Sequence, residues 1–414
     1  MTRIAHGRAT FAGRDPAEEH RAATPLELLY DLTLVVAFGT AADELAHMLA
    51  EGHATAGVGG FALAIFAISW AWLNYTWLAS AYDTDDWVFR LATMTQMGGV
   101  VVLALGIQPA LASIADGGPF DGRTMVAGYV VMRIAQVGLW ARVAREDPPR
   151  RPAALRYIAT LGVAQLGWVV YASADLSLTA AGTWFCAGLL VELVGPALAE
   201  RAARTPWHPR HIAERYGLLV LITLGEGVLG TVAAVRALVH GDHGWTAEAA
   251  GLTVAGVGLA FACWWAYFGL PWAQMLADDH RQAGAFGFGY GHLLLFGALV
   301  AMGAGLHVAA YALEGTAVVG PPAVVACVAA PVGVFLVALH AISFVHRGVP
   351  DRVDALLLAL AVAVPAGTVL LAVAGLGTTW CLLVLLLAPS ASVLGQELAQ
   401  EDQRSTPTTE GGAT

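Results

Sequence analysis

The chain contains no lysine, and all of its 21 basic residues are arginine. Charged residues make up only 13% of its 414 residues, whereas a soluble globular protein carries about 25%. Hydrophobic residues make up 57%, and the mean hydropathy is +0.65. This shortage of charge excludes an ordinary soluble domain and indicates a membrane protein.

Cysteine is also scarce, and motifs of known chemistry are missing. The four cysteines lie inside apolar segments, and none forms a CxxC pair or stands in a loop where a disulfide is expected. The chain has no P-loop, no HExxH and no GxSxG, and its histidines are scattered without metal-ligand spacing. We therefore expect no cofactor, no metal site and no enzymatic activity.

The first 23 residues are polar and contain no apolar core. They lack the pattern of a cleaved signal peptide, so we expect the first membrane-spanning helix to direct insertion. Residues 1–23 are interpreted as a mobile, cytoplasmic polar tail, and residues 400–414 as a disordered cytoplasmic tail.

Apolar runs of about 20 residues, long enough to cross a bilayer as a helix, recur along the chain. They predict an all-α, polytopic helical membrane protein with about 12 transmembrane helices. The expected helices span 26–49, 57–80, 88–112, 124–143, 153–173, 178–199, 209–238, 246–275, 286–312, 322–345, 353–374 and 378–398.

Three motifs recur in the same order in the two halves of the chain. They are a glutamate that opens an aliphatic run, a W-x-x-Y pattern before an acidic turn, and two spaced glycines. The matching residues are Glu27 and Glu214, Trp72 and Trp264, Tyr75 and Tyr267, Gly98 and Gly297, and Gly106 and Gly305. We therefore expect two parallel six-helix repeats, 24–200 and 201–399, with binding sites where the repeats meet.

Arginines gather on one side of the predicted membrane. When the N-terminus is placed in the cytoplasm, the exceptions are Arg123 and Arg236 on the outer side and Arg133 inside a helix. Positive residues favour the cytoplasmic side. We therefore expect a multi-pass protein of the cell membrane with both termini in the cytoplasm.

The first helix carries acids into its apolar run. Thr24 stands at the cap position, Pro25 suits the first helical position, and Glu27 stands where a capping box has an acid. Asp31 lies one turn further on the same face. Ionisable groups inside a membrane are costly and often mark function. Glu27 and Asp31 are therefore candidate site residues, and capping at the interface is the alternative for Glu27.

Three further charges lie deep in predicted helices. Glu226 comes about 18 Å along its helix from Glu214, near the bilayer centre, and its alternative role is a protonated group that joins helices. Arg133 needs an anion, and Glu192, Glu226 and Asp31 are all possible partners. A structural ion pair is the alternative to a role in ion transfer.

Uncharged polar residues also occur inside the predicted helices. Gln96, Gln108, His307 and His340 form a possible polar path, with helix-bridging hydrogen bonds as the alternative. The tryptophans, including Trp70 and Trp72, are expected to form interfacial belts and to pack between helices.

Two of these motifs resemble those of the bacterial low temperature requirement A family. The first reads Glu27-Leu28-Leu29-Tyr30-Asp31-Leu32-Thr33-Leu34-Val35, with Leu29 where the family has an aromatic residue. The second comprises Glu214, Arg215, Gly217, Leu218, Val220, Leu224, Gly225 and Glu226. The resemblance extends over nearly the whole membrane region. It implies an integral membrane protein in which Glu27, Asp31, Glu214 and Glu226 matter, but it implies no substrate.

The function expected from these features is a secondary transporter or ion-translocating carrier that uses intramembrane carboxylates. Asp31 and Glu226 would be protonatable, with Arg133 and Glu192 as counter-charges. An ion channel, a membrane enzyme and a structural protein of cold adaptation are the alternatives. The expected partners are the lipid bilayer and an unidentified small solute or ion, with no nucleic acid, and the sequence does not fix the oligomeric state.

Overall fold

The computed structural model describes residues 9–405 except 17, 19–20, 119, 175, 177, 240–243, 279–281 and 348–351. Within this part of the chain every regular element is a helix. Twelve helical segments are long and apolar enough to cross a membrane, so the expected all-α polytopic architecture is confirmed. The chain forms two compact units, residues 1–222 and 223–414.

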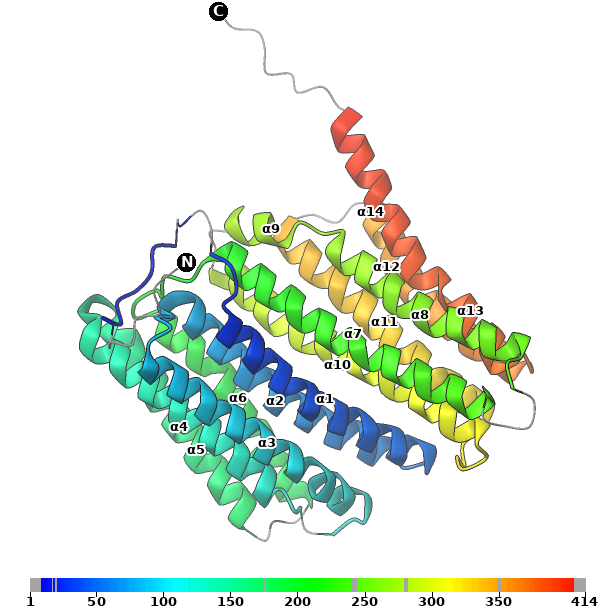
Figure 1. The fold of residues 1–414 in the computed structure, drawn as a ribbon, viewed down its shortest axis with the longest axis horizontal. Coiled ribbons are helices and arrows are strands. Elements are labelled where there is room, and N and C mark those ends of the chain that lie inside the picture. The colour runs from blue at the N-terminus through cyan, green and yellow to red at the C-terminus, as the bar shows by residue number, and fades with distance from the viewer. Residues whose placement is uncertain are drawn as a thin grey trace, which may run out of the picture. The chain divides into compact units, whose positions relative to one another are not determined.

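The first unit contains six long helices and the beginning of a seventh (Figure 1). These are α1 (Pro25–Ala50), α2 (Ala54–Tyr82), α3 (Trp87–Ala115), α4 (Arg123–Glu146), α5 (Arg151–Ser173), α6 (Leu178–Glu200) and residues 209–222 of α7 (Pro209–Val239), with a short 3-10 turn (Pro148–Arg150) before α5. The unit boundary falls within α7, whereas the expected first repeat ends at residue 200. His211 and Arg215 consequently belong to the first unit.

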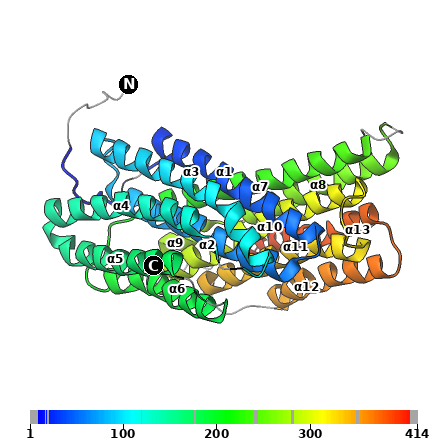
Figure 2. The same ribbon diagram turned by 90° about the horizontal axis from the view of Figure 1, so that it is seen from below.

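Glycines set the closest helix contacts in the first unit, where α3 packs along α4 (Figure 2). A methyl group added to Gly106 would overlap the backbone of Met125, and one added to Gly128 would overlap the backbone of Leu103. Small residues let helix backbones approach, and dispersion contacts then stabilise the pair within a membrane.

The second unit contains the rest of α7 and the helices that follow it. These are α8 (Ala247–Phe268), α9 (Trp272–Asp278), α10 (Gln282–Leu313), α11 (Pro321–Arg347), α12 (Arg352–Val373), α13 (Thr378–Leu385) and α14 (Leu387–Ser405). The helix expected over 246–275 is interrupted because Pro271 has no amide hydrogen to continue the ladder. The disordered tail expected from residue 400 begins inside α14, which is helical to Ser405.

Many large apolar side chains lie on the outside of the helices. Leu32 is 60% exposed, Leu105 69% and Leu166 70%, and all three lie within spanning segments. Burial of such side chains drives folding in water, so their exposure along whole helices fits contact with lipid.

The sequence predicts a mobile tail over residues 1–23; residues 1–8 lie outside the described part of the chain, whereas residues 9–16 pack against the ends of helices. Phe11 is fully buried, stacks on Tyr82 and lies under the guanidinium of Arg142. Its amide donates to Glu146, and Arg142 bonds both Asp86 and the carbonyl of Ala9. Because the segment is polar overall, nothing in the sequence indicated that the Phe11 side chain would anchor it.

Candidate functional site

A cluster of charged residues is buried where α1, α2 and α7 meet in the first unit, and we call it the Arg215 cluster. It consists of Glu27, Asp31, His211 and Arg215, with Trp72 against it. α1 begins with the expected capping box: the Thr24 hydroxyl accepts the amide of Glu27, and Glu27 Oε2 accepts the amide of Thr24 at 2.7 Å. The cap fixes where α1 starts and so directs Glu27 and Asp31 inward.

Arg215 reaches both acids from α7. Its Nη1 lies 2.9 Å from Glu27 Oε1, and its Nη2 donates to Asp31 Oδ1 at 2.6 Å. Trp72 Nε1 donates to the same Asp31 oxygen at 2.7 Å, and His211 Nε2 lies 3.1 Å from Glu27 Oε1. All five side chains are buried. The planar guanidinium suits this arrangement because it offers donors to two carboxylates at once.

The cluster continues through Arg21 and Asp83, which are also buried. Arg21 Nη2 lies 3.7 Å from Glu27 and 3.6 Å from Asp83. The connected group therefore contains three carboxylates and two guanidiniums, and with His211 neutral its formal charge is negative by one. One proton would neutralise it, which a low-dielectric interior favours.

Asp83 stands between α2 and α3, outside the spanning segments. Burial of its carboxyl, together with the charge of Glu27 nearby, raises the pKa of Asp83 to about 6, although Arg21 opposes the shift. The neighbouring Asp86 shows the reverse: burial raises its pKa, but hydrogen bonds from Arg142 and from the Phe89 amide outweigh burial and lower it.

The second group in this unit surrounds Glu192 on α6, and we call it the Glu192 cluster. Glu192 is 4% exposed and pairs with Arg133 of α4, whose Nη2 lies 3.3 Å from Oε2. This resolves the choice among the three possible partners of Arg133. The carboxylate also accepts hydrogen bonds from Trp70 at 2.9 Å, Tyr129 at 2.8 Å, Trp168 at 3.2 Å and Gln165 at 3.3 Å. Such complete pairing is what a buried charge requires.

Buried polar atoms without a hydrogen-bond partner occur near both clusters, on α1 to α4. They include Asp31 Oδ2, the hydroxyls of Tyr30 and Ser69, both amide atoms of Gln96, Arg133 Nε and Gln136 Nε2. Native proteins leave few such atoms without a partner from protein or water. We call these six residues the polar band. It includes Gln96, whose place in a polar path stays a prediction.

Side-chain contacts connect the polar band to the two clusters. Tyr30 packs on Tyr75 with ring centroids 4.4 Å apart, and Tyr75 bonds Thr93, one turn before Gln96 on α3. Gln136 accepts a hydrogen bond from Arg133 at 2.8 Å. Tyr30 also interacts electrostatically with both Asp31 and Arg133. The band therefore extends from the Arg215 cluster toward the Glu192 cluster.

The remaining expected site residues lie outside these clusters. Glu214 is exposed on α7 and accepts the amide of Ala23 at 3.1 Å, and Gln108 is exposed near the end of α3. In the second unit, Glu226 is 3% exposed, and Gly303 of α10 packs against its backbone. His307 packs beside Gly230, and His340 is buried with its Nε2 2.9 Å from Ser392 Oγ.

Several side chains of the two clusters escaped sequence reasoning. Trp70 and Trp72 are fully buried, so they pack between helices, as one part of the prediction stated, rather than forming an interfacial belt. The sequence did not predict that they donate to Glu192 and Asp31. His211 and Arg215 are spaced four apart on α7, a spacing that places them on one helix face and could have indicated a paired role. Within the described residues, no group of three His, Cys, Asp or Glu side chains is arranged to hold a metal ion.

Comparison with known proteins identifies relatives of this chain. The model of the bacterial low temperature requirement A protein family (LtrA) matches residues 22–389. Uncharacterized protein RA0937 of Rhizobium meliloti (strain 1021) is 26% identical over 314 residues, which cover 72% of this chain and 71% of the relative. No solved structure matches. Because the family model covers most of the chain, including the Arg215 and Glu192 clusters, the chain belongs to the bacterial low temperature requirement A family.

Proposed function

We propose that this membrane protein is a secondary transporter or ion-translocating carrier, in which Asp31 and Glu226 bind and release protons. The observation that carries the proposal is the Arg215 cluster, where a buried group of charges has one more acid than guanidinium. Asp31 Oδ1 is occupied by Arg215 and Trp72, while Oδ2 is buried without a partner. A proton has a free oxygen to bind and a net charge to neutralise.

The polar band supports movement of that proton. Unpaired hydroxyl and amide groups in the interior can hold water molecules by hydrogen bonds, and water beside the Asp31 carboxylate can pass a proton on. The band begins at Asp31 and Tyr30 and includes Gln136, which is bonded to Arg133. Arg133 and Glu192 pair with each other and would act as the fixed counter-charges of the path.

The proposed architecture is a pair of parallel six-helix repeats, and two matched contacts support it. Tyr75 bonds Thr93 at 3.0 Å in the first unit, and Tyr267 bonds His292 at 2.9 Å in the second. The two tyrosines occupy equivalent W-x-x-Y positions. Their partners stand at the same distance before the matching glycines Gly106 and Gly305.

The second matched contact involves those glycines. A methyl group on Gly106 would overlap Met125 of the next helix, and one on Gly305 would overlap Cys327 of the next helix. The same packing of α3 on α4 and of α10 on α11 is what a duplicated chain would retain. We further propose that the protein lies in the cell membrane with both termini cytoplasmic, because arginines are concentrated on that side.

The experiment uses the full chain in proteoliposomes that contain a pH-sensitive dye. A potassium diffusion potential is imposed, and proton flux is compared for the wild type, Asp31→Asn and Glu226→Gln. Asp43→Asn is the matched control, because Asp43 is an exposed acid at the far end of α1. We expect flux in the wild type and in the control and loss of flux in the two test variants. Equal flux in all four proteins would contradict the proposal.

An ion channel is the second candidate, and the unpaired amide of Gln96 inside the polar band is the observation that favours it. A channel passes ions downhill at a rate that rises with concentration, whereas a carrier saturates. Initial flux measured over a wide range of proton gradients therefore separates the two.

A further inference from the structure

A cavity lies at the end of the second unit where α10 ends and where α11 and α13 begin. It encloses about 230 Å³. Ala309, Ala312 and Ala317 line it at and just beyond the end of α10, and Thr378 and Thr379 line it at the start of α13. The alanines are too small to fill the space, so it stays open. An occupant would meet an apolar wall with two hydroxyl groups in it.

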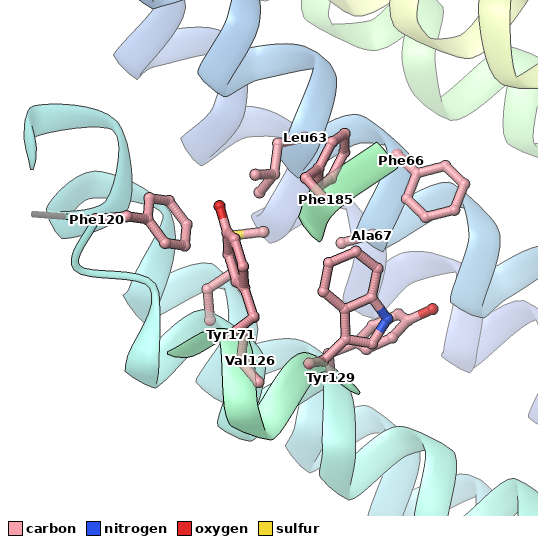
Figure 3. Close-up of a pocket in the computed structure, with 10 residues that line it drawn as sticks. Leu63, Phe66, Ala67, Phe120, Val126, Tyr129, Tyr171 and Phe185 are labelled. Carbon is pink, nitrogen blue, oxygen red and sulfur yellow. The ribbon is translucent and has the colours of Figure 1, made fainter. Parts of the chain in front are cut away.

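The first unit has a pocket where α4 begins, the matching place in the repeat proposed above, and aromatic rings fill it (Figure 3). Phe120 from the turn before α4, Tyr171 from α5 and Phe185 from α6 line this pocket, which has only about 30 Å³ free. The first unit thus shows that side chains can close such a space. An unfilled void costs stability, so the open cavity of the second unit is a candidate binding site.

The helix α13 begins at this cavity with backbone donors that lack a cap. The residue before it is Gly377, which has no side chain to bond the first turn. Within the part of the chain that the structure describes, no hydrogen bond is formed by the amides of Thr378, Thr379 and Trp380. The first amides of a helix need a partner from outside the helix.

The ends of α10 and α11 do not offset these donors. The amides of Gly315, Thr316 and Ala317 turn back to carbonyls in the last turn of α10. The helix α11 begins with two prolines, which have no amide hydrogen, and its next two amides bond the carbonyl of Gly320. The unmet groups at the cavity are therefore mostly donors, and they call for an acceptor.

The side chain of Thr379 adds a buried donor. Only 8% of Thr379 is exposed, and its methyl carbon packs on Gly251 of α8, which leaves the hydroxyl as the branch that faces the cavity. No hydrogen bond to this hydroxyl occurs among the described residues. A buried hydroxyl without a partner costs free energy, which an acceptor in the cavity would recover.

We propose that the cavity binds a short-chain carboxylate, with its head at the start of α13 and its chain against the alanines of α10. The positive end of a helix favours an anion, and its free amides donate to it. No arginine is among the described residues that line the cavity, so a single negative charge suits it better than a doubly charged head. Glu248 and Glu314 near this end are exposed, and solvent screens them. Binding does not depend on the carrier function proposed above.

The test measures binding to the purified full chain in detergent at neutral pH, by isothermal titration calorimetry. The probes are hexanoate, which is ionised at this pH, and hexanamide, which has the same chain and a neutral head. We expect hexanoate to bind at least about tenfold more tightly, because hydrogen bonds to a charged acceptor and the helix dipole both favour it. Equal affinity, tighter binding of hexanamide, or no binding of hexanoate would overturn the proposal.

Thr379→Val tests the donor. Valine keeps the methyl group that packs on Gly251 and removes only the hydroxyl, so hexanoate should bind about tenfold more weakly. Thr253→Val is the matched control, because the Thr253 hydroxyl of α8 bonds the carbonyl of Ala249 within its own helix. Equal affinity in the two variants would exclude Thr379 as a ligand of the head group and overturn the proposed position of the head.

Ala312→Leu tests the location. The larger side chain fills the cavity, so it should abolish binding of hexanoate while the unfolding midpoint stays level or rises. Ala187→Leu, at an exposed position of α6, is the control and should bind hexanoate normally. Unchanged binding in Ala312→Leu would place the site elsewhere. If Thr379→Val does not fold, as size-exclusion chromatography would show, the comparison of the two leucine variants decides. Because none of these measurements involves transport, a failure of proton flux in proteoliposomes leaves their outcome unchanged.

Discussion

Arg215 bridges two acids that lie one turn apart on α1, with Nη1 2.9 Å from Glu27 Oε1 and Nη2 2.6 Å from Asp31 Oδ1. No single lysine ammonium could occupy both positions, because a guanidinium presents its donors in a fixed fork. The bridge ties the start of α7 to the start of α1, and it makes each of the three residues depend on the other two.

Replacing Arg215 by glutamine should destabilise the protein strongly. Removing one partner of a buried ion pair costs about 3–5 kcal/mol, because the remaining charges stay buried. The midpoint of thermal unfolding in detergent should fall further for Arg215→Gln than for Arg215→Lys. Lysine keeps the positive charge but can form an ion pair with only one of the two acids. Arg210→Gln, at an exposed position on the same helix, is the control. Adding Asp31→Asn to Arg215→Gln should restore part of the loss, and a purely additive loss would refute the bridge.

Gly106→Ala should separate α3 from α4. The added methyl group overlaps the backbone of Met125, and relief requires the helices to move apart, at a cost of about 1–3 kcal/mol. Gly98→Ala is matched to it on the same helix, since nothing lies within 4 Å of the added carbon. Unfolding midpoints should fall for Gly106→Ala and stay level or rise for Gly98→Ala. The reverse order would exclude close packing at Gly106.

Asp83 should make stability depend on pH. Its pKa is raised from 3.8 to about 6, so between these values the folded protein holds a proton that the unfolded chain releases. Stability from this group is therefore present below about pH 4 and is lost as the pH rises to about 6. The whole shift corresponds to about 3 kcal/mol.

Asp83→Asn removes this titration. Unfolding midpoints are compared between pH 4.5 and pH 7.5, and the variant should gain stability relative to the wild type at the higher value. Asp85→Asn, whose carboxyl is half exposed and bonded to Arg90, controls for the loss of a charge in this turn. Parallel pH profiles for Asp83→Asn and the wild type would contradict the assignment.

Phe11→Ala should release the segment before α1. The ring is fully buried among Tyr82, Phe89 and Arg142, and its loss removes the contacts that hold the segment down. Trypsin should then cleave after Arg14, whose amide is bonded to the carbonyl of Ala81 in the intact protein. Time courses of cleavage compare this variant with wild type. Unchanged protection of Arg14 would show that the hydrogen bonds suffice without the ring.

The sequence predicts the membrane helices well because length and apolarity are local properties, and all twelve expected spans have counterparts in the structure. The capping box of Thr24 and Glu27 is equally local and is confirmed. Pro271 is present in the sequence and favours a break in the helix. The prediction of one unbroken helix followed the apolar residues around it instead.

Partners across the fold are harder to predict, because they depend on which helices become neighbours. Arg133 had three possible anions in the sequence, and only the packing of α4 on α5, and of α5 on α6, selects Glu192. For Trp72, the sequence does not show whether the indole donates a hydrogen bond to Asp31 inside the protein or lies at the membrane surface. The proton-carrier role of Asp31 and Glu226 stays a prediction.

The Arg215 bridge also has a consequence for biosynthesis. Arg215 follows Asp31 by 184 residues, so at about 5–20 residues per second the ribosome needs about 10–40 s to reach it. During that interval α1 has reached the translocon with two acids that lack their arginine, and the first six helices alone cannot complete the first unit. The nascent chain must therefore keep these acids protonated or near water until α7 is made, and a chain truncated before α7 should be a substrate for membrane proteases.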